Sequence, residues 1–233
     1  IMHKMGLHGR AVIPLVAGAG CNVPAIMGTR VLSSMRERII ASTLVVLTPC
    51  SARTTVILGA VSLTVGWKAA LGIYGVTFAL AVLTGIGMHR LLPGRSTGLV
   101  MEMFPFRRPA ALPILKKTWY RFHHFAVVAT PIVLGGSIVL GGLYETGLLW
   151  KLAVPLRPIM EGWLGIPSVA GLTLIVAILR KELALQLLIT LAMVQHGPQA
   201  TNLLSFMRPD QIVVYALVNT IYIPCAATIA VLG

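Results

Sequence analysis

The sequence predicts an all-α polytopic membrane protein with broken and re-entrant helices, arranged as two gate-like repeats. Three observations support this fold class. Hydrophobic residues make up 57% of the 233 residues, charged residues make up 11%, and the mean hydropathy is +0.88, which lies outside the balance of soluble proteins. Several charge-free runs approach the roughly 20 apolar residues that a membrane span requires. Prolines interrupt some of these runs beside a cysteine, and hydrocarbon tolerates such breaks where they line protein or a watery cavity.

The first charge-free run, residues 11–29, is long enough to cross a membrane but contains Pro14, Gly18, Gly20 and Pro24. Lysine and arginine residues flank it on both sides, whereas a true crossing leaves one side poor in cations. Proline and glycine also interrupt a helix. We therefore expect a re-entrant hairpin with both of its ends on the cytoplasmic side.

The next runs differ in their regularity. Residues 39–67 carry Arg53 as their one charge and contain an internal proline, so we expect a broken span. Residues 69–88 and 125–144 are charge-free and are predicted to be ordinary spans. Between these two spans, residues 90–121 are rich in lysine and arginine and are predicted to be a cytoplasmic loop.

The last third of the chain holds two irregular segments. Residues 211–232 are charge-free but contain a proline, and residues 166–195 are interrupted by Arg180-Lys181-Glu182. The latter segment is either a hairpin that turns at these three residues or one long span. A hairpin makes the last proline-containing helix run opposite to the first one, whereas a span makes it run parallel.

These elements predict three parts of the chain. Residues 1–68 form the first gate-like repeat, residues 69–165 hold the connecting spans and the basic loop, and residues 166–233 form the second repeat. Pro-Cys-Ser-Ala at residues 49–52 resembles Pro-Cys-Ala-Ala at residues 224–227, and such paired interruptions indicate the binding site of a carrier. The chain begins with isoleucine and stops soon after the second Pro-Cys pair, so we expect a piece of a longer protein, truncated at its C-terminal end.

Cys21, Cys50 and Cys225 are the predicted metal ligands. Each stands beside an interruption in an apolar segment and not in an exported loop, so we expect reduced thiols instead of disulfides. Thiols that face a cavity bind soft or borderline metal ions. Separate thiols also suit transport, because a closed four-thiolate site would hold the metal too firmly to release it. The alternative is that these cysteines pack as small hydrophobic residues.

Seven further residues are predicted to belong to the pathway or its gates: Asn22, Pro24, Pro49, Ser51, Pro224, Glu182 and Glu102. The amide of Asn22 either offers a carbonyl ligand or caps a broken helix. Glu182 is an acid within an apolar segment, which its basic neighbours either neutralise or leave available to a cation. Glu102 is either an exit ligand or part of a salt bridge in the basic loop. A cation at Arg53 would repel a metal ion, so we expect a structural role, paired with a carboxylate or with helix-end carbonyls.

Ordered motifs along the chain resemble one family. The strings Gly9-Arg10-Ala11-Val12-Ile13-Pro14, GAGCNVPAIMGTR at residues 18–30 and Pro49-Cys50-Ser51-Ala52-Arg53 closely resemble the membrane domain of the bacterial ferrous iron transporter FeoB. Residues 101–107, 179–182 and 222–228 are similar to further motifs of that family. Phe104 and Phe106 stand where the family usually has a proline and a tyrosine.

The resemblance implies uptake of Fe²⁺, as the transported substrate, across a prokaryotic inner membrane by a permease region that is not itself an enzyme. The family normally begins with a cytoplasmic G domain, but no Gly-x-x-x-x-Gly-Lys-Ser/Thr loop occurs here. We therefore expect no bound nucleotide in this chain and GTP hydrolysis in a separate domain. The expected partners are that G domain, membrane lipid and a small FeoA-like accessory protein, and association into a homo-oligomer is left open.

Two other functions remain open. A related carrier for another divalent metal or a nucleoside-like solute would explain the broken helices, although a nucleoside favours polar hydrogen-bonding groups over thiols. An intramembrane enzyme with a cysteine nucleophile needs a nearby base, and no histidine falls within the three thiol-bearing stretches. The net charge of +13 indicates cytoplasmic loops and contact with anionic lipid headgroups, and nucleic acid is not an expected partner.

Overall fold

The computed structural model describes residues 7, 9–92, 110–147, 160, 162, 165–181, 183–196, 203–205 and 207–232. The regular elements within these residues are all helical. In chain order they are η2 (Gly9–Ala11), α1 (Val12–Gly18), α2 (Asn22–Gly28), η3 (Thr29–Val31), α3 (Met35–Leu47), α4 (Ser51–Val56), the π-helix η4 (Ile57–Ser62), α5 (Trp67–Leu91), α6 (Ala111–Glu145), α9 (Ser168–Val176), α10 (Leu183–His196), η6 (Leu203–Ser205), α11 (Pro209–Ile221) and α12 (Ala226–Leu232).

The chain reverses at residues 19–21, so that α1 and α2 pack against each other as a hairpin. The amides of Gly20 and Cys21 both donate to the carbonyl of Ala17, at 3.0 and 3.2 Å, and this contact ends α1. Each helix has 7 residues and is therefore only about 10 Å long, too short to cross a hydrocarbon core of about 30 Å. The structure thus shows the hairpin that was expected for residues 11–29.

The first long apolar stretch, Met35–Ser62, is broken near its middle. The amide of Thr48 closes the last turn of α3, after which the backbone becomes extended. Pro49 has no N–H and disfavours a helical conformation in the residue before it. Cys50 is also extended, with φ −78° and ψ 172°, and α4 begins directly after it. The proline therefore accounts for the break that separates α3 from α4.

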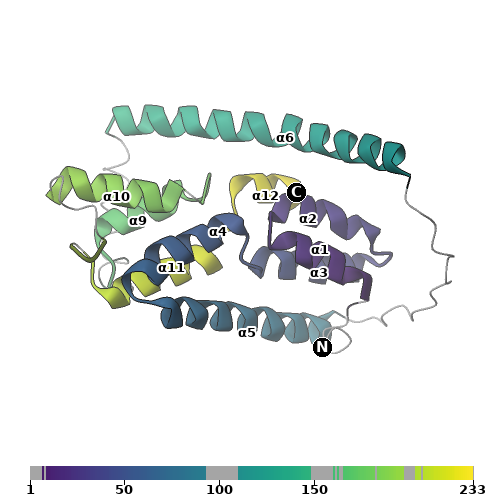
Figure 1. Ribbon diagram of the computed structural model, residues 1–233, viewed down its shortest axis with the longest axis horizontal. Coiled ribbons are helices and arrows are strands. Elements are labelled where there is room, and N and C mark those ends of the chain that lie inside the picture. Colours follow the sequence, from purple (N-terminus) through teal and green to yellow (C-terminus); the bar gives the residue numbers. More distant parts are fainter. Residues whose placement is uncertain are drawn as a thin grey trace.

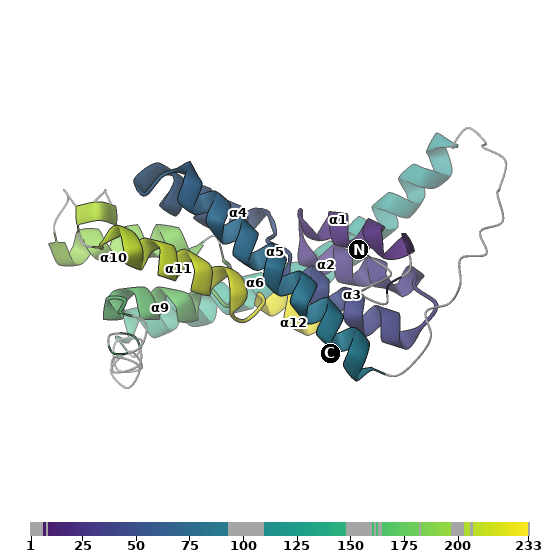
Figure 2. The ribbon, with the colours of Figure 1, turned by 90° about the horizontal axis from the view of Figure 1, so that it is seen from below.

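The second half of the chain repeats this plan. Helices α9 and α10 pack against each other, so residues 166–195 form a hairpin and not one long span. Helices α11 and α12 are separated by a break that contains Pro224. Helix α11 packs against η4, whereas α12 packs against α2. The two broken helices consequently run in opposite directions and meet near their breaks (Figure 1, Figure 2).

Helices α5 and α6 lie along the two long sides of this centre (Figure 1). Gly66 makes the turn into α5 with a φ of +117°, a conformation that an L side chain rarely adopts. The charge-free run 125–144 lies within α6. Helix α5 continues to Leu91 and α6 begins at Ala111, so both ends of the predicted loop 90–121 are helical.

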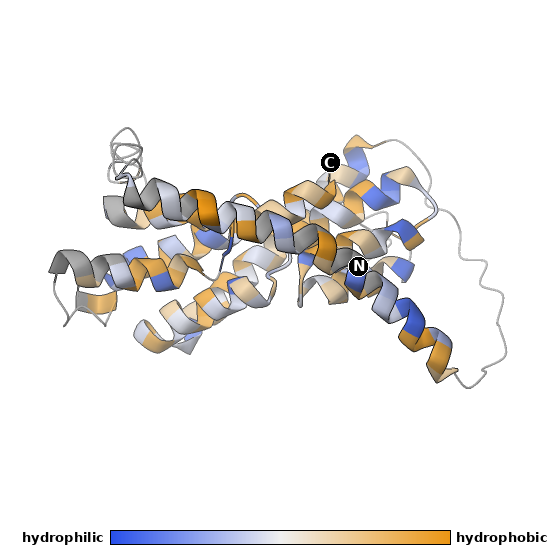
Figure 3. Ribbon diagram, turned by 90° about the horizontal axis from the view of Figure 1, so that it is seen from above, coloured by the Kyte–Doolittle hydropathy of each residue, from blue (hydrophilic) through white to orange (hydrophobic). Residues whose placement is uncertain are grey.

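Three helical stretches in the described part of the chain are long and apolar enough to cross a membrane: Met35–Ser62, Trp67–Leu91 and Pro209–Leu232. Many of their large apolar side chains face outwards, such as Leu71 and Phe78 on α5, which are 62% and 66% exposed. Figure 3 shows hydrophobic residues along the outer helices and hydrophilic residues near the projecting end of α6. The chain is a multi-pass membrane protein, in which these outward side chains meet lipid.

A buried apolar core joins the two halves. Ile57, Ala60 and Val61 of η4 belong to the same buried cluster as Leu188 of α10 and Tyr215 of α11. The hydroxyl of Tyr215 forms a hydrogen bond with the hydroxyl of Thr173 at 2.9 Å, so its polar end is satisfied inside this core. The core therefore fixes the second hairpin against the first broken helix.

Candidate functional site

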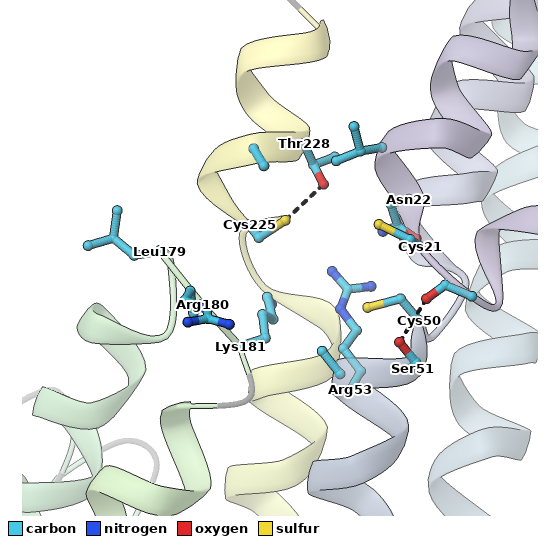
Figure 4. A pocket seen from close by; sticks show the side chains of 14 residues that line it. Cys21, Asn22, Cys50, Ser51, Arg53, Leu179, Arg180, Lys181, Cys225 and Thr228 are labelled. Atoms are coloured by element: carbon cyan, nitrogen blue, oxygen red, sulfur yellow. Dashed lines mark hydrogen bonds between the residues drawn. The ribbon is translucent and has the colours of Figure 1, made fainter. Parts of the chain in front are cut away.

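A cavity of about 250 Å³ lies where the two breaks meet. Both hairpins and both broken helices contribute to its walls. The residues that line it include Cys21, Asn22, Cys50, Ser51 and Arg53 from the first half, and Arg180, Lys181, Cys225 and Thr228 from the second (Figure 4). The fold thus gathers into one place residues that are as much as two hundred positions apart in the sequence.

Main-chain hydrogen bonds hold each hairpin tip against the helix that follows a break. The amide and the hydroxyl of Ser51 both donate to the carbonyl of Gly20, at 3.1 and 2.9 Å. In the second half, the amide of Ala226 donates to the carbonyl of Ile178 at 2.8 Å. Amides at the start of a helix have no partner within their own helix. In each half, therefore, the hairpin tip satisfies the first amide of the short helix beyond the break.

The three cysteines are free thiols at or just before the starts of short helices. Cys21 and Cys50 are the N-cap residues of α2 and α4, and Cys225 immediately precedes α12. The Sγ of Cys225 lies 3.0 Å from the hydroxyl oxygen of Thr228. Among the described residues, no three His, Cys, Asp or Glu side chains are placed to hold one metal ion together. The cavity thus offers separate sulfur positions instead of a closed cage.

Arg53 extends from α4 into the cavity (Figure 4) and is 1% exposed. Its Nη1 donates to the carbonyl of Val46, in the last turn of α3, at 2.6 Å. Carbonyls in the last turn of a helix lack amide partners within that helix and carry the negative end of its dipole. Contact with a helix-end carbonyl is one of the two arrangements expected for this arginine. Its structural role remains a prediction.

Lys181 stands in the turn of the second hairpin, is 3% exposed, and reaches across to the end of α11. Its Nζ donates to the carbonyl of Asn219 at 2.7 Å and lies 4.4 Å from the centre of the Tyr222 ring. The Tyr222 hydroxyl donates to the carbonyl of Leu174, which fixes the ring against α9. The ammonium group is therefore held by one oxygen and one aromatic face, which are both favourable partners for a cation.

Asn22 is 5% exposed and joins the first hairpin to α3. With the amide oriented so that its nitrogen faces the neighbouring carbonyls, it donates to Gly18 at 3.1 Å and to Val45 at 3.3 Å. This geometry satisfies carbonyls at the ends of both α1 and α3. Whether the oxygen of this amide also meets a transported ion stays a prediction.

The other predicted pathway residues fall in three places. Pro24 is exposed on α2, and Pro49 and Pro224 stand at the two breaks. Glu102 and Glu182 lie outside the described residues. Their roles as exit ligand and intramembrane acid stay predictions.

Sequence reasoning missed the contacts of Lys181 with Asn219 and Tyr222. It considered Lys181 mainly as a neighbour that neutralises Glu182. A signal was available, because a lysine inside an apolar segment is costly unless it is paired or faces water. The sequence could not show which oxygen pairs with it, since that partner lies on another helix.

Two family models match the chain. The Gate model, described as nucleoside recognition, matches residues 1–64 and 126–233, the segments that contain both hairpins and both broken helices. A second model, described as the C terminus of ferrous iron transport protein B, matches residues 70–121. No solved structure matches the sequence significantly.

Curated relatives agree with these matches. The whole chain is 30% identical to the Fe(2+) transporter FeoB of Methanocaldococcus jannaschii over 258 aligned residues and covers 38% of that protein. Part of the chain, 60% of it, is 36% identical to 17% of the Fe(2+) transport protein A/Fe(2+) transporter FeoB fusion protein of Porphyromonas gingivalis. A similar part, 65%, is 30% identical to 20% of the Fe(2+) transporter FeoB of Salmonella typhimurium. The chain thus spans well under half the length of these relatives.

The inverted hairpins and broken helices, together with the split match, define a helical membrane protein of the Gate type. The chain belongs to the ferrous iron transport protein B family, FeoB, and corresponds to part of its C-terminal membrane region.

Proposed function

We propose that this chain is the permease part of a transporter that carries Fe²⁺ into the cell. The observation that carries the proposal is the cavity at the two helix breaks, which all three cysteines line. Fe²⁺ is a borderline cation that accepts sulfur ligands. Because the thiols do not form a closed cluster within the described residues, an ion can exchange one sulfur ligand for the next.

A nucleoside is the second candidate substrate, because the matching Gate model is described as nucleoside recognition. The uncharged polar side chains of the cavity argue against it. The amide of Asn22 has carbonyl partners, the hydroxyl of Ser51 donates to Gly20, and Thr228 lies within hydrogen-bond distance of Cys225. These groups are already engaged inside the protein, whereas a nucleoside site needs polar groups that are free to converge on the ligand. The cavity therefore suits a metal ion better.

The relatives support proposals for the membrane, the G domain and the partner protein of this chain. We place the chain in the cytoplasmic membrane of a prokaryote, with GTP hydrolysis in a G domain elsewhere in the full-length protein and with no nucleotide bound by this chain. One relative is a fusion of Fe(2+) transport protein A with FeoB. A small FeoA-like protein is therefore the proposed cytoplasmic partner.

The test is anaerobic Fe²⁺ uptake into proteoliposomes that contain the full-length protein. We expect Cys21→Ser, Cys50→Ser and Cys225→Ser each to lower uptake about tenfold or more at equal protein content, a loss typical of a disturbed metal site. Excess adenosine should leave the uptake unchanged. Normal uptake in all three variants would remove the thiols from the pathway. Uptake of labelled adenosine by the wild type, without movement of Fe²⁺, would favour the nucleoside carrier.

A further inference from the structure

Two buried cations occupy equivalent positions in the two halves of the cavity. Arg53 donates to the carbonyl of Val46 in the last turn of α3, and Lys181 donates to the carbonyl of Asn219 in the last turn of α11. Helices α3 and α11 are the first segments of the two broken helices. Each break exposes carbonyls that no longer have an amide partner one turn further on. In both halves, a side chain of the protein fills that position with a positive charge.

Carbonyl ends of broken helices are the places where other carriers bind hard cations such as Na⁺. Oxygen atoms and the negative helix end favour a small hard ion there, whereas sulfur favours a softer one. The three thiols line the cavity, and Arg53 and Lys181, which also line it, each cover one helix-end carbonyl that lies behind the cavity wall. Selection between ions therefore depends on which ligands remain available.

Two contacts hold the ammonium group of Lys181 at one of these helix-end carbonyls. Its ammonium group has the Asn219 carbonyl at 2.7 Å and the Tyr222 ring at 4.4 Å, and it is 3% exposed. The amide group of Asn219 is fully buried, and both its oxygen and its nitrogen lack hydrogen-bond partners among the described residues. An unsatisfied buried oxygen on the same residue as the carbonyl is a second potential ligand for a cation once the ammonium group is removed.

We propose that Lys181, together with Arg53, determines the specificity of the pathway by excluding hard cations. The two side chains occupy the helix-end carbonyls and add positive charge to the cavity, so that an entering ion must gain its stabilisation from the thiols. Na⁺ gains little from sulfur and is repelled by the like charges of Arg53 and Lys181, in a cavity whose wall also includes Arg180. A borderline divalent ion compensates for that repulsion through bonds to sulfur. This inference rests on the proposed function, because it assigns the selectivity of the same cavity.

The test measures two fluxes in the same proteoliposomes with the full-length protein: Na⁺ entry, reported by an entrapped Na⁺-sensitive dye, and Fe²⁺ entry. We expect Lys181→Met to raise Na⁺ entry about tenfold or more, because a charge that repels Na⁺ is lost and an oxygen site is opened. Lys181→Gln removes the charge but keeps a hydrogen-bond donor for the Asn219 carbonyl, and it should also raise Na⁺ entry. Lys181→Arg keeps the charge, and its Na⁺ entry should stay as low as that of the wild type. Lys68→Met, at an exposed position of α5, is the matched control and should behave as the wild type.

The outcomes separate this inference from the proposed function. Wild-type Fe²⁺ entry with no rise of Na⁺ entry in Lys181→Met and Lys181→Gln would overturn the inference and leave the proposed function standing. Loss of folded protein in both neutral variants would also overturn it, because Lys181 would then be needed for structure alone. Absence of Fe²⁺ entry in the wild type, with Na⁺ entry raised in both neutral variants, would overturn the proposed function and support the role of Lys181 in excluding hard cations.

Discussion

Asn22 links three helices through one small amide. It follows Cys21 at the start of α2, and its nitrogen faces the carbonyls of Gly18 and Val45. Both carbonyls belong to helix ends: the Val45 carbonyl also accepts from the amide of Thr48 at 3.2 Å, whereas the Gly18 carbonyl has no other hydrogen-bond partner among the described residues. The position of the neighbouring thiol therefore depends on this asparagine, even if the amide never contacts the transported ion.

Asn22→Leu should destabilise the protein by about 1–3 kcal/mol, because it removes the donor and leaves the carbonyl of Gly18 unsatisfied, while that of Val45 keeps the amide of Thr48. The measurement is thermal unfolding of the purified protein in detergent. Reaction of Cys21 with a maleimide should also become faster as the hairpin loosens. Gln186→Leu, which alters an amide on the exposed face of α10, is the control and should change neither property. An unchanged midpoint in Asn22→Leu would show that the amide does not hold the hairpin.

The residues of the site differ in how far the sequence could predict them. The three cysteines and Arg53 were candidates because each is unusual inside an apolar run, and they all line the cavity. The contact of Lys181 with Asn219 was not predictable, since the two residues are on separate elements and Asn219 looks like an ordinary polar residue of a helix. Local chemistry marks a residue as exceptional, but tertiary packing decides what it contacts.

At the scale of helices, proline and glycine gave the most reliable prediction. The breaks at Pro49 and Pro224 and the hairpin in residues 11–29 occur where these residues remove donors or weaken a helix. The second hairpin has no such marker within its turn, and for that reason the sequence left residues 166–195 open between a hairpin and a span. Packing of α9 against α10 resolves the alternative.

The contact between η4 and α10 joins one half of the protein to the other. A Cβ added at Gly59 would lie 3.0 Å from Cδ2 of Leu185, so a larger residue there requires the Leu185 side chain to shift. We expect Gly59→Val to lower the free energy of unfolding by about 1–3 kcal/mol, the usual cost of overpacking. Thermal unfolding in detergent measures this cost.

Two comparisons test whether the contact of residue 59 with Leu185 causes the loss of stability. Gly72→Val is the control, because a Cβ added at Gly72 meets no other atom within 4 Å. Leu185→Ala in the Gly59→Val background should recover part of the lost stability, since it removes the side chain that collides. If the double variant were no more stable than the sum of the two single changes predicts, the collision with Leu185 would not explain the effect.

In the molecule as a whole, the two broken helices run in opposite directions, and this arrangement brings the two halves together at one site. Each half places its hairpin tip on the first amide of its own short helix, through Ser51 and Ala226, and the two halves meet at one cavity. Such an inverted arrangement is typical of carriers whose substrate site lies near the middle of the membrane. It also explains why residues from both ends of the chain line the same space.

The charge of the whole chain leads to a last prediction. Lysine and arginine number 19 against 6 acidic residues, and Lys116 and Lys117 are exposed in the first turns of α6, beside the exposed rings of Trp119 and Phe122. A basic segment with apolar neighbours binds the headgroups of anionic lipids, with about 1 kcal/mol for each basic residue near the surface. Phosphatidylglycerol should therefore raise the unfolding temperature of the protein in mixed micelles more than phosphatidylcholine does. The difference should shrink in Lys116→Gln/Lys117→Gln and at high salt, because these contacts are screened. Equal stabilisation by both lipids, with no effect of salt, would mean that the positive charge serves topology or a protein partner instead of the membrane surface.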